Sequence, residues 1–397
     1  MKNGSYKEII LMAAMEEGYI TTHALGMLKD HQKYIRQTIC DLTREGYLAD
    51  RRITHTVKKR KYIIKYKAIT KKGIEFVCKK YSDKYTYLNY IPLPLPEFHI
   101  VRSSTSDTLY NHLQSINASV LFAQTGIRTV CITGSDIKEG LSFKEMIYMA
   151  KKQDRIQNGT EITLGLEDAK NNYIHSRDLY PLFKMPEDEK QQLIFTQQIG
   201  FLIDKGESYI VYSAKKTGVK ISHTMLKRVR ACFKRYTLEH HINVGMVTLN
   251  RGIILADTPT EWLKSFKNNL DPKNNMTIDK MFDDLYLLPV CRDAIYVIDK
   301  IMYYKEELSR IVQEVLLNYD YDFNLNKGLM YKNRNVVIGI DMNLHRLNSI
   351  YNSLRRDPDR KYTIVCAFWQ EKYYRMVFHD NVEYYCISED LLCPNCF

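Results

Sequence analysis

Residues 20–48 read ITTHALGMLKDHQKYIRQTICDLTREGYL. Within them, Ile35, Ile39 and Leu42 are spaced i, i+4 and i+7, so they fall on one stripe of a helix predicted from about Gln32 to Glu45. The other side of that helix carries a polar and cationic face, which such a helix needs to enter the major groove of DNA. The residues of this face are Lys33, Tyr34, Arg36, Gln37 and Arg44.

The flanking sequence completes a unit over residues 5–81. Before the amphipathic helix, Ser5 can cap a first helix, and Thr21 or Thr22 can open a short second one. After it, the alternation of residues 47–57 and 62–69 predicts a two-stranded ribbon, and Thr70 caps a closing helix. Three helices, a ribbon and a closing helix are typical of a winged helix-turn-helix. The tip of the wing is basic and suits phosphates or the minor groove; it consists of Lys58, Lys59, Arg60 and Lys61.

The charge of the chain is concentrated in this unit. The 397 residues carry a formal net charge of +12. Residues 1–85 hold 19 Lys and Arg against 9 Asp and Glu, a net of +10, which leaves +2 for the other 312 residues. This excess indicates a polyanionic partner, and double-stranded DNA is the partner that the predicted fold favours. A winged helix that serves only protein contacts is the alternative.

The remaining sequence predicts a mixed α/β body behind a linker. Pro92, Pro94 and Pro96 favour an extended linker over residues 82–98. We expect an α/β domain over residues 99–270 and a helical plus α/β region over 271–397, after a DNA-binding domain at 1–81. In the last region, residues 279–317 are expected to be mostly helical, and strands are expected to alternate with helices from residue 335 to 387. The fold class is α+β, with an N-terminal winged helix-turn-helix followed by a body with a degenerate restriction-endonuclease-like core.

This core is predicted from the element order between residues 193 and 250. Strands 193–203 and 208–214, a helix over 222–240 and a strand over 244–249 follow the order found in PD-(D/E)xK nucleases. Such a site needs carboxylates that hold Mg²⁺ and a lysine that polarises the scissile phosphate. Asp204 and Lys215 are present, but Ser213 stands where a metal-binding Glu is required. The domain is therefore expected to be inactive, and a Mg²⁺-dependent nuclease or nickase is the alternative.

The predicted helix over residues 222–240 offers a second basic surface. Its apolar stripe leaves a cationic remainder that fits either a solvated outer helix or a second nucleic-acid or partner surface. The residues of this surface are Lys227, Arg228, Arg230, Lys234 and Arg235.

Cysteines and hydropathy indicate a reducing, cytoplasmic setting. Nine cysteines with irregular spacing are more typical of buried thiols than of a disulfide framework. No apolar stretch approaches the roughly 20 residues of a spanning helix, so no membrane contact is expected. Cys393 and Cys396 have zinc-knuckle spacing, and Cys386 could be a third ligand, but only half a site is visible, so no cofactor is expected.

Two segments quoted above and three further ones resemble one family. Residues 20–25 and 42–48 resemble the winged-helix start of replication-relaxation proteins, which plasmids and conjugative elements of low-GC Gram-positive bacteria encode. Residues 176–179 (SRDL), 198–203 (QIGFLI) and 209–212 (YIVY) are similar to the middle of these proteins. The resemblance spans roughly residues 5–260. It implies a winged helix followed by a nuclease-like domain that often lacks an active site.

The sequence thus predicts a protein that binds double-stranded DNA with some sequence preference. The resemblance implies a mobile genetic element, where the protein would act in plasmid replication control, mobilisation or transcriptional regulation. Its partners besides DNA include a second copy in a homodimer, or other replication or conjugation proteins; the sequence leaves both open. A third hypothesis is a protein-interaction adaptor.

Overall fold

The structure is a computed structural model in which the chain forms two compact units. The first unit comprises residues 1–208 and 224–248, and the second comprises residues 209–223 and 249–397. Helices and several sheets occur together, so the fold belongs to the α+β class. The residues that the structure describes are 6–28, 32–57, 60–99, 106–130, 142–158, 172–188, 197–204, 207–215, 218–239, 249–270, 278–304, 307–325, 328–378 and 381–388.

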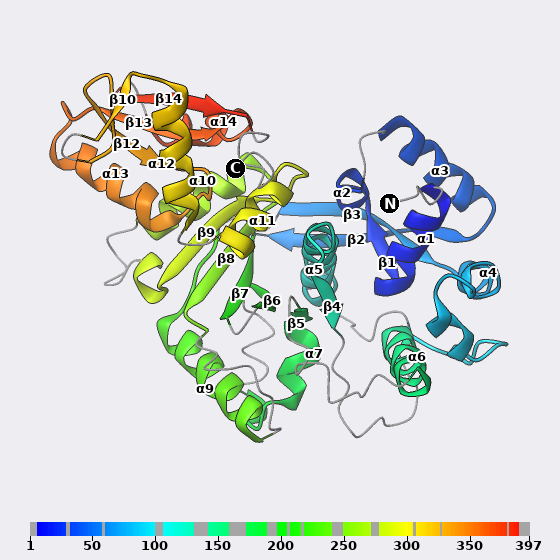
Figure 1. Cartoon of the computed structure of the whole chain (residues 1–397). Helices are drawn as coiled ribbons and strands as arrows, with labels where there is room; N and C mark the ends of the chain where they lie inside the picture. The colour runs from blue at the N-terminus through cyan, green and yellow to red at the C-terminus, as the bar shows by residue number, and fades with distance from the viewer. Residues whose placement is uncertain are drawn as a thin grey trace. The chain divides into compact units, whose positions relative to one another are not determined.

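The N-terminal part of the first unit combines helices with a three-stranded sheet (Figure 1). Its strand order is β1-β3-β2, and both pairs are antiparallel. Every helix and strand predicted here is present, and the short strand β1 is an addition. The elements are α1 (Tyr6–Glu17), β1 (Tyr19–Thr21), α2 (Thr22–Gly26), α3 (Gln32–Arg44), β2 (Leu48–Val57), β3 (Arg60–Ile69) and α4 (Lys71–Tyr81).

Two threonines cap helices in this part, as their positions predicted. The Thr21 hydroxyl accepts a hydrogen bond from the Ala24 amide at 2.9 Å and so begins α2. The Thr70 hydroxyl does the same for the Gly73 amide at 3.0 Å and begins α4. A Cβ at Gly73 would lie 2.3 Å from the Tyr47 carbonyl oxygen, so only glycine fits there. The expected cap at Ser5 lies outside the described residues.

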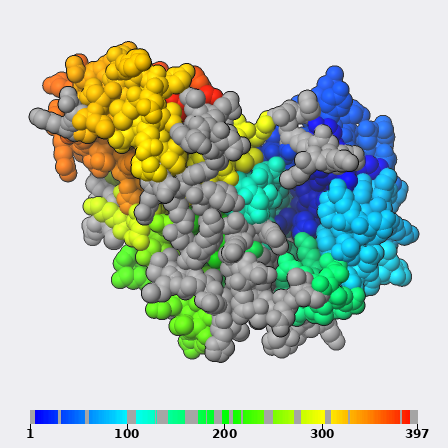
Figure 2. All heavy atoms as spheres, in the orientation of Figure 1, coloured from blue at the N-terminus to red at the C-terminus, as the bar shows by residue number. Residues whose placement is uncertain are grey.

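Within the predicted linker over residues 82–98, the part before the prolines is helical and packed rather than extended. The 3-10 helix η1 (Thr86–Tyr90) packs against α6 (Phe143–Gln157), and both lie side by side at the surface in Figure 2. Tyr87 and Leu88 are buried, and the Tyr87 hydroxyl donates a hydrogen bond to Glu16 on α1 at 2.9 Å. The aromatic residues before the prolines supply the apolar surface that holds this segment in place.

The rest of the first unit is built around α5 (Ser106–Ala123). Strand β4 (Arg128–Val130) is parallel to β5 (Asn172–His175), and β5 is antiparallel to β6 (Gln198–Asp204). Helix α5 packs against all three strands. The remaining described elements of this unit are α7 (Ser176–Leu179), η2 (Tyr180–Leu182) and α9 (His223–Glu239).

The second unit contains three parallel strands and a further sheet. Strand β8 (Arg251–Ala256) lies between β7 (Glu207–Ala214) and β9 (Asp284–Pro289), and is parallel to both. Helix α10 (Pro259–Asn269) leads from β8 to β9, and its fully buried Trp262 donates a hydrogen bond to the Leu287 carbonyl at 2.8 Å. After β9 follow α11 (Ala294–Tyr304) and α12 (Glu307–Tyr319).

The C-terminal sheet has the order β10-β11-β12-β13-β14. Its last three strands are parallel, and β12 joins β13 through α13 as β13 joins β14 through α14. This alternation agrees with the predicted one. The elements are β10 (Phe323–Asn324), β11 (Met330–Tyr331), β12 (Arg334–Ile338), α13 (Leu344–Arg356), β13 (Tyr362–Ala367), α14 (Glu371–Tyr374) and β14 (Val382–Ile387).

One prediction for the middle of the chain was wrong, and one strand was missed. Residues 279–317 were expected to be mostly helical, yet β9 lies within them. The strand expected over 244–249 lies mostly outside the described residues, and β8, which begins at Arg251, was not predicted. Both strands are continuous apolar runs that are buried on both faces, and periodicity alone does not separate such a run from a buried helix.

Candidate nucleic-acid interface

Helix α3 presents the cationic face that its spacing predicted. Ile35, Ile39 and Leu42 are buried, and they fix the helix on the domain. Lys33 and Arg36 are exposed, and neither has an ion-pair or hydrogen-bond partner among the described residues. The other predicted members of this face, Tyr34, Gln37 and Arg44, are exposed as well.

An acidic residue that the sequence reading passed over divides this face. The carboxylate of Asp41 accepts hydrogen bonds from Gln37 Nε2 at 3.2 Å and from Arg44 Nη2 at 2.7 Å. Both contacts are local pairs on the helix surface, so they cost little to break. Lys33 and Arg36, in the N-terminal half of α3, can therefore bind an anion directly. In the C-terminal half, Asp41 neutralises the charge of Arg44.

The ribbon carries a second cationic surface, on its outer face. The strand register pairs Arg52 with Lys65 and Thr56 with Lys61, and all four side chains are exposed on one face. Ile63, between the two lysines on this face, is 62% exposed. Among the described residues, Arg52, Lys61 and Lys65 have no ion-pair or hydrogen-bond partner. The prediction included Lys61 but missed Arg52 and Lys65, which the alternation of each strand could have revealed.

The outer face of the ribbon adjoins α3. Lys67 on β3 contacts Asp50 on β2 at 2.7 Å and the hydroxyl of Thr43 on α3 at 3.3 Å. This contact places the cationic face of the ribbon next to the helix, so the two form one surface. We call it the α3–ribbon surface. Its cations are Lys33, Arg36, Arg44, Arg52, Lys61 and Lys65. Lys58, Lys59 and the side chain of Arg60, which were predicted to join them, lie outside the described part of the chain.

The inner face of the ribbon is covered by α5. The ring of His55 stacks on that of Tyr110, with 4.2 Å between centroids and 2° between planes. The Thr21 hydroxyl on β1 donates a hydrogen bond to Asn117 of α5, and both side chains are buried. These contacts fix the orientation of the ribbon, so that the outer face is the one left for a partner.

Beside α5 lies a buried cluster of charged and polar residues that the sequence reading missed. Glu17, at the end of α1, lies 3.4 Å from Lys144 on α6 and 3.4 Å from the imidazole of His175 at the end of β5. Lys144 also reaches Asp178 at 3.5 Å. Arg177 donates a hydrogen bond to Nε2 of His112 at 2.8 Å. The contact between Glu17 and Lys144 joins residues that are 127 positions apart in the chain, so no local sequence pattern relates them.

The negative and positive charges of this buried cluster are equal in number. Burial opposes the charge of Glu17, but the cation of Lys144 and a hydrogen bond from His175 outweigh it and hold the pKa of the carboxyl well below its ordinary value. Burial likewise opposes the charge of Asp178, and Lys144 with Arg177 lowers its pKa. Burial, aided by the same two cations, lowers the pKa of both His112 and His175. The cluster therefore contains two carboxylates, two cations and two neutral histidines.

The second predicted basic surface, on α9, is less available to an anion. Lys227, Lys234 and Arg235 are exposed, whereas Arg228 and Arg230 are half-buried. Arg235 pairs with Glu239 at 2.9 Å, and Glu239 also holds Lys184 at 2.8 Å. This surface resembles a solvated helix more than a binding face.

The geometry does not favour the predicted nuclease pair. Asp204 ends β6 and lies three residues before Glu207, whereas Lys215 follows Ala214 at the other end of β7. The seven steps from Glu207 to Ala214 span about 23 Å at ~3.3 Å per residue. A carboxylate and a lysine that hold one Mg²⁺ and its phosphate must lie within a few ångströms of each other. The length of β7 therefore argues against a shared site.

Two absences hold for the part of the chain that the structure describes. It contains no helix that is both long and apolar enough to span a bilayer, and no group of three or more His, Cys, Asp or Glu residues that could hold a metal ion. Of the cysteines considered for zinc, Cys386 lies on β14 beside Cys366 and Glu371. Cys393 and Cys396 lie outside the described residues.

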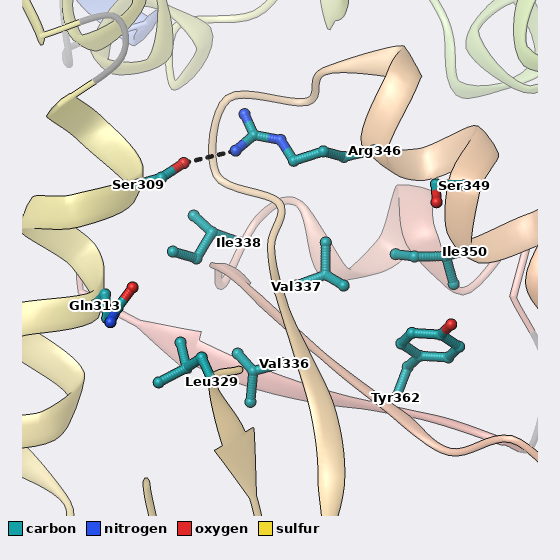
Figure 3. Close-up of a pocket in the computed structure, with 10 residues that line it drawn as sticks. All are labelled: Ser309, Gln313, Leu329, Val336, Val337, Ile338, Arg346, Ser349, Ile350 and Tyr362. Atoms are coloured by element: carbon teal, nitrogen blue, oxygen red, sulfur yellow. Dashed lines mark hydrogen bonds between the residues drawn. The ribbon is translucent and has the colours of Figure 1, made fainter. Parts of the chain in front are cut away.

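A cavity of about 350 Å³ opens in the second unit between α12 and α13 (Figure 3). Leu329, Val336 and Ile338 supply apolar walls. At one end, Arg346 donates a hydrogen bond to the Ser309 hydroxyl at 2.7 Å and forms an ion pair with Asp341. Among the described residues that line the cavity, Arg346 is the one charged side chain, and its ion pair with Asp341 leaves no net charge there to select an anion.

Comparisons with known proteins find no matching family model, no similar curated protein and no similar solved structure. The α3–ribbon surface must therefore be interpreted from its own chemistry.

Proposed function

We propose that this chain is a double-stranded DNA-binding protein whose residues 6–81 act as a winged helix-turn-helix. The observation that supports it is the α3–ribbon surface: five of its six cations have no protein partner among the described residues, and they extend over a helix and an adjoining ribbon. Lysine and arginine side chains left unpaired on one surface are typical of phosphate contacts.

In this proposal α3 enters the major groove and the ribbon follows the neighbouring backbone. A major groove about 12 Å wide admits a helix, and Arg36 and Gln37 are side-chain types that form two hydrogen bonds with one base. Gln37 is held by Asp41 in the free protein, so reading a base with Gln37 requires that contact to break. The cations of the ribbon, in contrast, serve affinity for any sequence.

The mobile-element setting is part of the proposal and rests on the resemblance to replication-relaxation proteins alone. Replication control, mobilisation and transcriptional regulation all require a protein that recognises a duplex site. The proposed activity is binding; the separation of Asp204 from Lys215 removes the main support for a nuclease.

A salt titration with the full-length chain tests the proposal. If the six cations of the α3–ribbon surface neutralise six phosphates, the logarithm of the binding constant should fall with the logarithm of the salt concentration at a slope of about −5. A variant with Arg52, Lys61 and Lys65 changed to Ala should bind with a slope closer to −3. A slope near zero, or no difference between the two proteins, would exclude this surface as the DNA site.

A further inference from the structure

Two cysteines face each other across neighbouring strands of the second unit. Strands β13 and β14 are parallel, and their register pairs Cys366 with Cys386. The two Sγ atoms are 4.0 Å apart, and both thiols are free. Cys366 is completely buried, whereas Cys386 is partly exposed. One thiol is therefore accessible from solvent, and the other lies directly behind it.

The backbone geometry of this pair is compatible with a disulfide. Paired residues on neighbouring strands lie about 4.8 Å apart, and residues joined by a disulfide have Cα atoms about 4.4–6.8 Å apart. Closing the gap from 4.0 Å to a bond of about 2.05 Å requires the two side chains to rotate, but not the strands to move. Among the described strands β14 is the last of its sheet, so it pairs with one neighbour, β13, and is less constrained than a central strand.

The groups around the exposed thiol act on it in opposite directions. The Sγ of Cys386 donates a hydrogen bond to Oε2 of Glu371 at 3.3 Å, and the negative charge of this carboxylate disfavours the thiolate. Arg375, one turn further along the chain, contacts the same carboxylate at 2.7 Å and keeps a cation close to the sulfur. The thiol of Cys366 can donate a hydrogen bond to the Cys386 sulfur, and this contact lowers the pKa of Cys386, which favours its reaction as a thiolate.

We propose that Cys366 and Cys386 form a reversible disulfide by exchange with a low-molecular-weight disulfide such as glutathione disulfide. Cys386, as the thiolate, attacks one sulfur of that molecule and displaces one glutathione thiolate. Cys366 then loses its proton and attacks Sγ of Cys386, which displaces the second glutathione. The protein loses two protons and two electrons, and the incoming disulfide is reduced to two thiols. The product links β14 covalently to β13 and ends the hydrogen bond from Cys386 to Glu371.

The test uses the full-length chain with Cys393 and Cys396 changed to Ser, so that these two thiols cannot compete. The protein is incubated with glutathione disulfide, its remaining thiols are blocked, and it is digested with trypsin without reduction. Cleavage after Lys361, Lys372 and Arg375 places Cys366 and Cys386 on two peptides, 362–372 and 376–397. We expect these peptides to appear as one linked species that separates on reduction.

Two variants of this protein show the order of the steps. In Cys366→Ala the reaction should stop at a mixed disulfide of Cys386 with glutathione, and in Cys386→Ala no reaction should occur at Cys366. The exposed Cys40 on α3 is an internal standard, because it contacts no other thiol of the described residues and should carry glutathione in every sample. The proposal is overturned if Cys386 of the parent keeps glutathione without linking to Cys366, or stays unreacted while Cys40 reacts.

Discussion

The imidazole of His55 on β2 lies parallel to the phenol of Tyr110 on α5, with 4.2 Å between the ring centroids. This stack lies on the face of the ribbon opposite Arg52, Lys61 and Lys65. Residues 6–81 therefore do not bury the inner face of the ribbon by themselves, because α5, which follows them in the chain, covers it. A surface proposed for DNA is thus held in place by the following helix.

Removing that ring should destabilise the first unit. Tyr110 is buried, and replacing a buried aromatic residue by alanine costs about 3 kcal/mol of unfolding free energy. We expect a loss of this size for Tyr110→Ala in urea unfolding of the full-length chain. Tyr319→Ala, at a tyrosine that is 66% exposed, should change it by less than about 0.5 kcal/mol. Equal losses in the two variants would contradict the role given to the stack.

Lys144 should be essential to the buried cluster. Its removal in Lys144→Met leaves Glu17 and Asp178 without their shared cation, and an uncompensated buried charge costs about 3 kcal/mol or more. A second change, Glu17→Gln, should recover part of this loss, since it removes one of the two carboxylates. Lys152→Met, at an exposed lysine on the same helix, should be nearly neutral. Strictly additive losses in the double variant would disprove the coupling between Lys144 and Glu17.

The two buried histidines should make stability depend on pH. Burial lowers the pKa of His112 and of His175 below the ordinary 6.5, so below pH 6.5 the unfolded chain binds more protons than the folded one. Their contribution is complete above pH 6.5 and is lost as the pH falls toward the lowered values. We expect unfolding free energy to fall between pH 7.5 and 5.5, by up to about 1.4 kcal/mol per pH unit for each histidine below pH 6.5. In His112→Asn the unfolding free energy should depend less steeply on pH. An unchanged dependence would mean that His112 does not contribute to it.

Base preference and general affinity should separate between α3 and the ribbon. Arg36→Ala should weaken binding to a preferred duplex by about 1–3 kcal/mol and relax the preference, because a two-bond contact with one base is lost. Lys61→Ala with Lys65→Ala should weaken preferred and random duplexes alike. Lys79→Ala with Lys80→Ala, at two exposed lysines of α4, removes the same charge elsewhere. The assignment fails if this third protein loses as much affinity as the ribbon variant.

Asp41 should restrain DNA binding. Asp41→Asn releases Arg44 and removes a negative charge from the α3–ribbon surface. We expect tighter binding at each salt concentration with the salt slope still near −5, because Arg44 no longer has to leave Asp41 before it contacts a phosphate. Glu314→Gln breaks an ion pair of the same kind, with Arg310 on α12, and should leave binding unchanged. Weaker binding by Asp41→Asn would mean that the carboxylate positions Gln37 and Arg44 rather than restraining them.

Local patterns predicted the N-terminal elements well. The spacing of Ile35, Ile39 and Leu42 and the threonine caps are short-range signals, and the structure contains the helices that they indicate. The same reasoning failed at β8 and β9, because strands buried on both faces lose the alternation that identifies a strand. It also missed the helix at residues 86–90, which forms because this tyrosine-rich segment packs on α6.

Apart from the short strand β1, the helices and strands up to Tyr81 and the cationic face of α3 follow from local sequence, because they depend on residues within a few positions of each other. Which face of the ribbon remains exposed depends instead on tertiary packing, since it follows from Tyr110 stacking on His55. Tertiary packing also brings Glu17 to Lys144 and Cys366 to Cys386, contacts that no local spacing encodes. Such pairs form when distant segments bury their apolar surfaces together, and the polar groups are carried along and must find partners there.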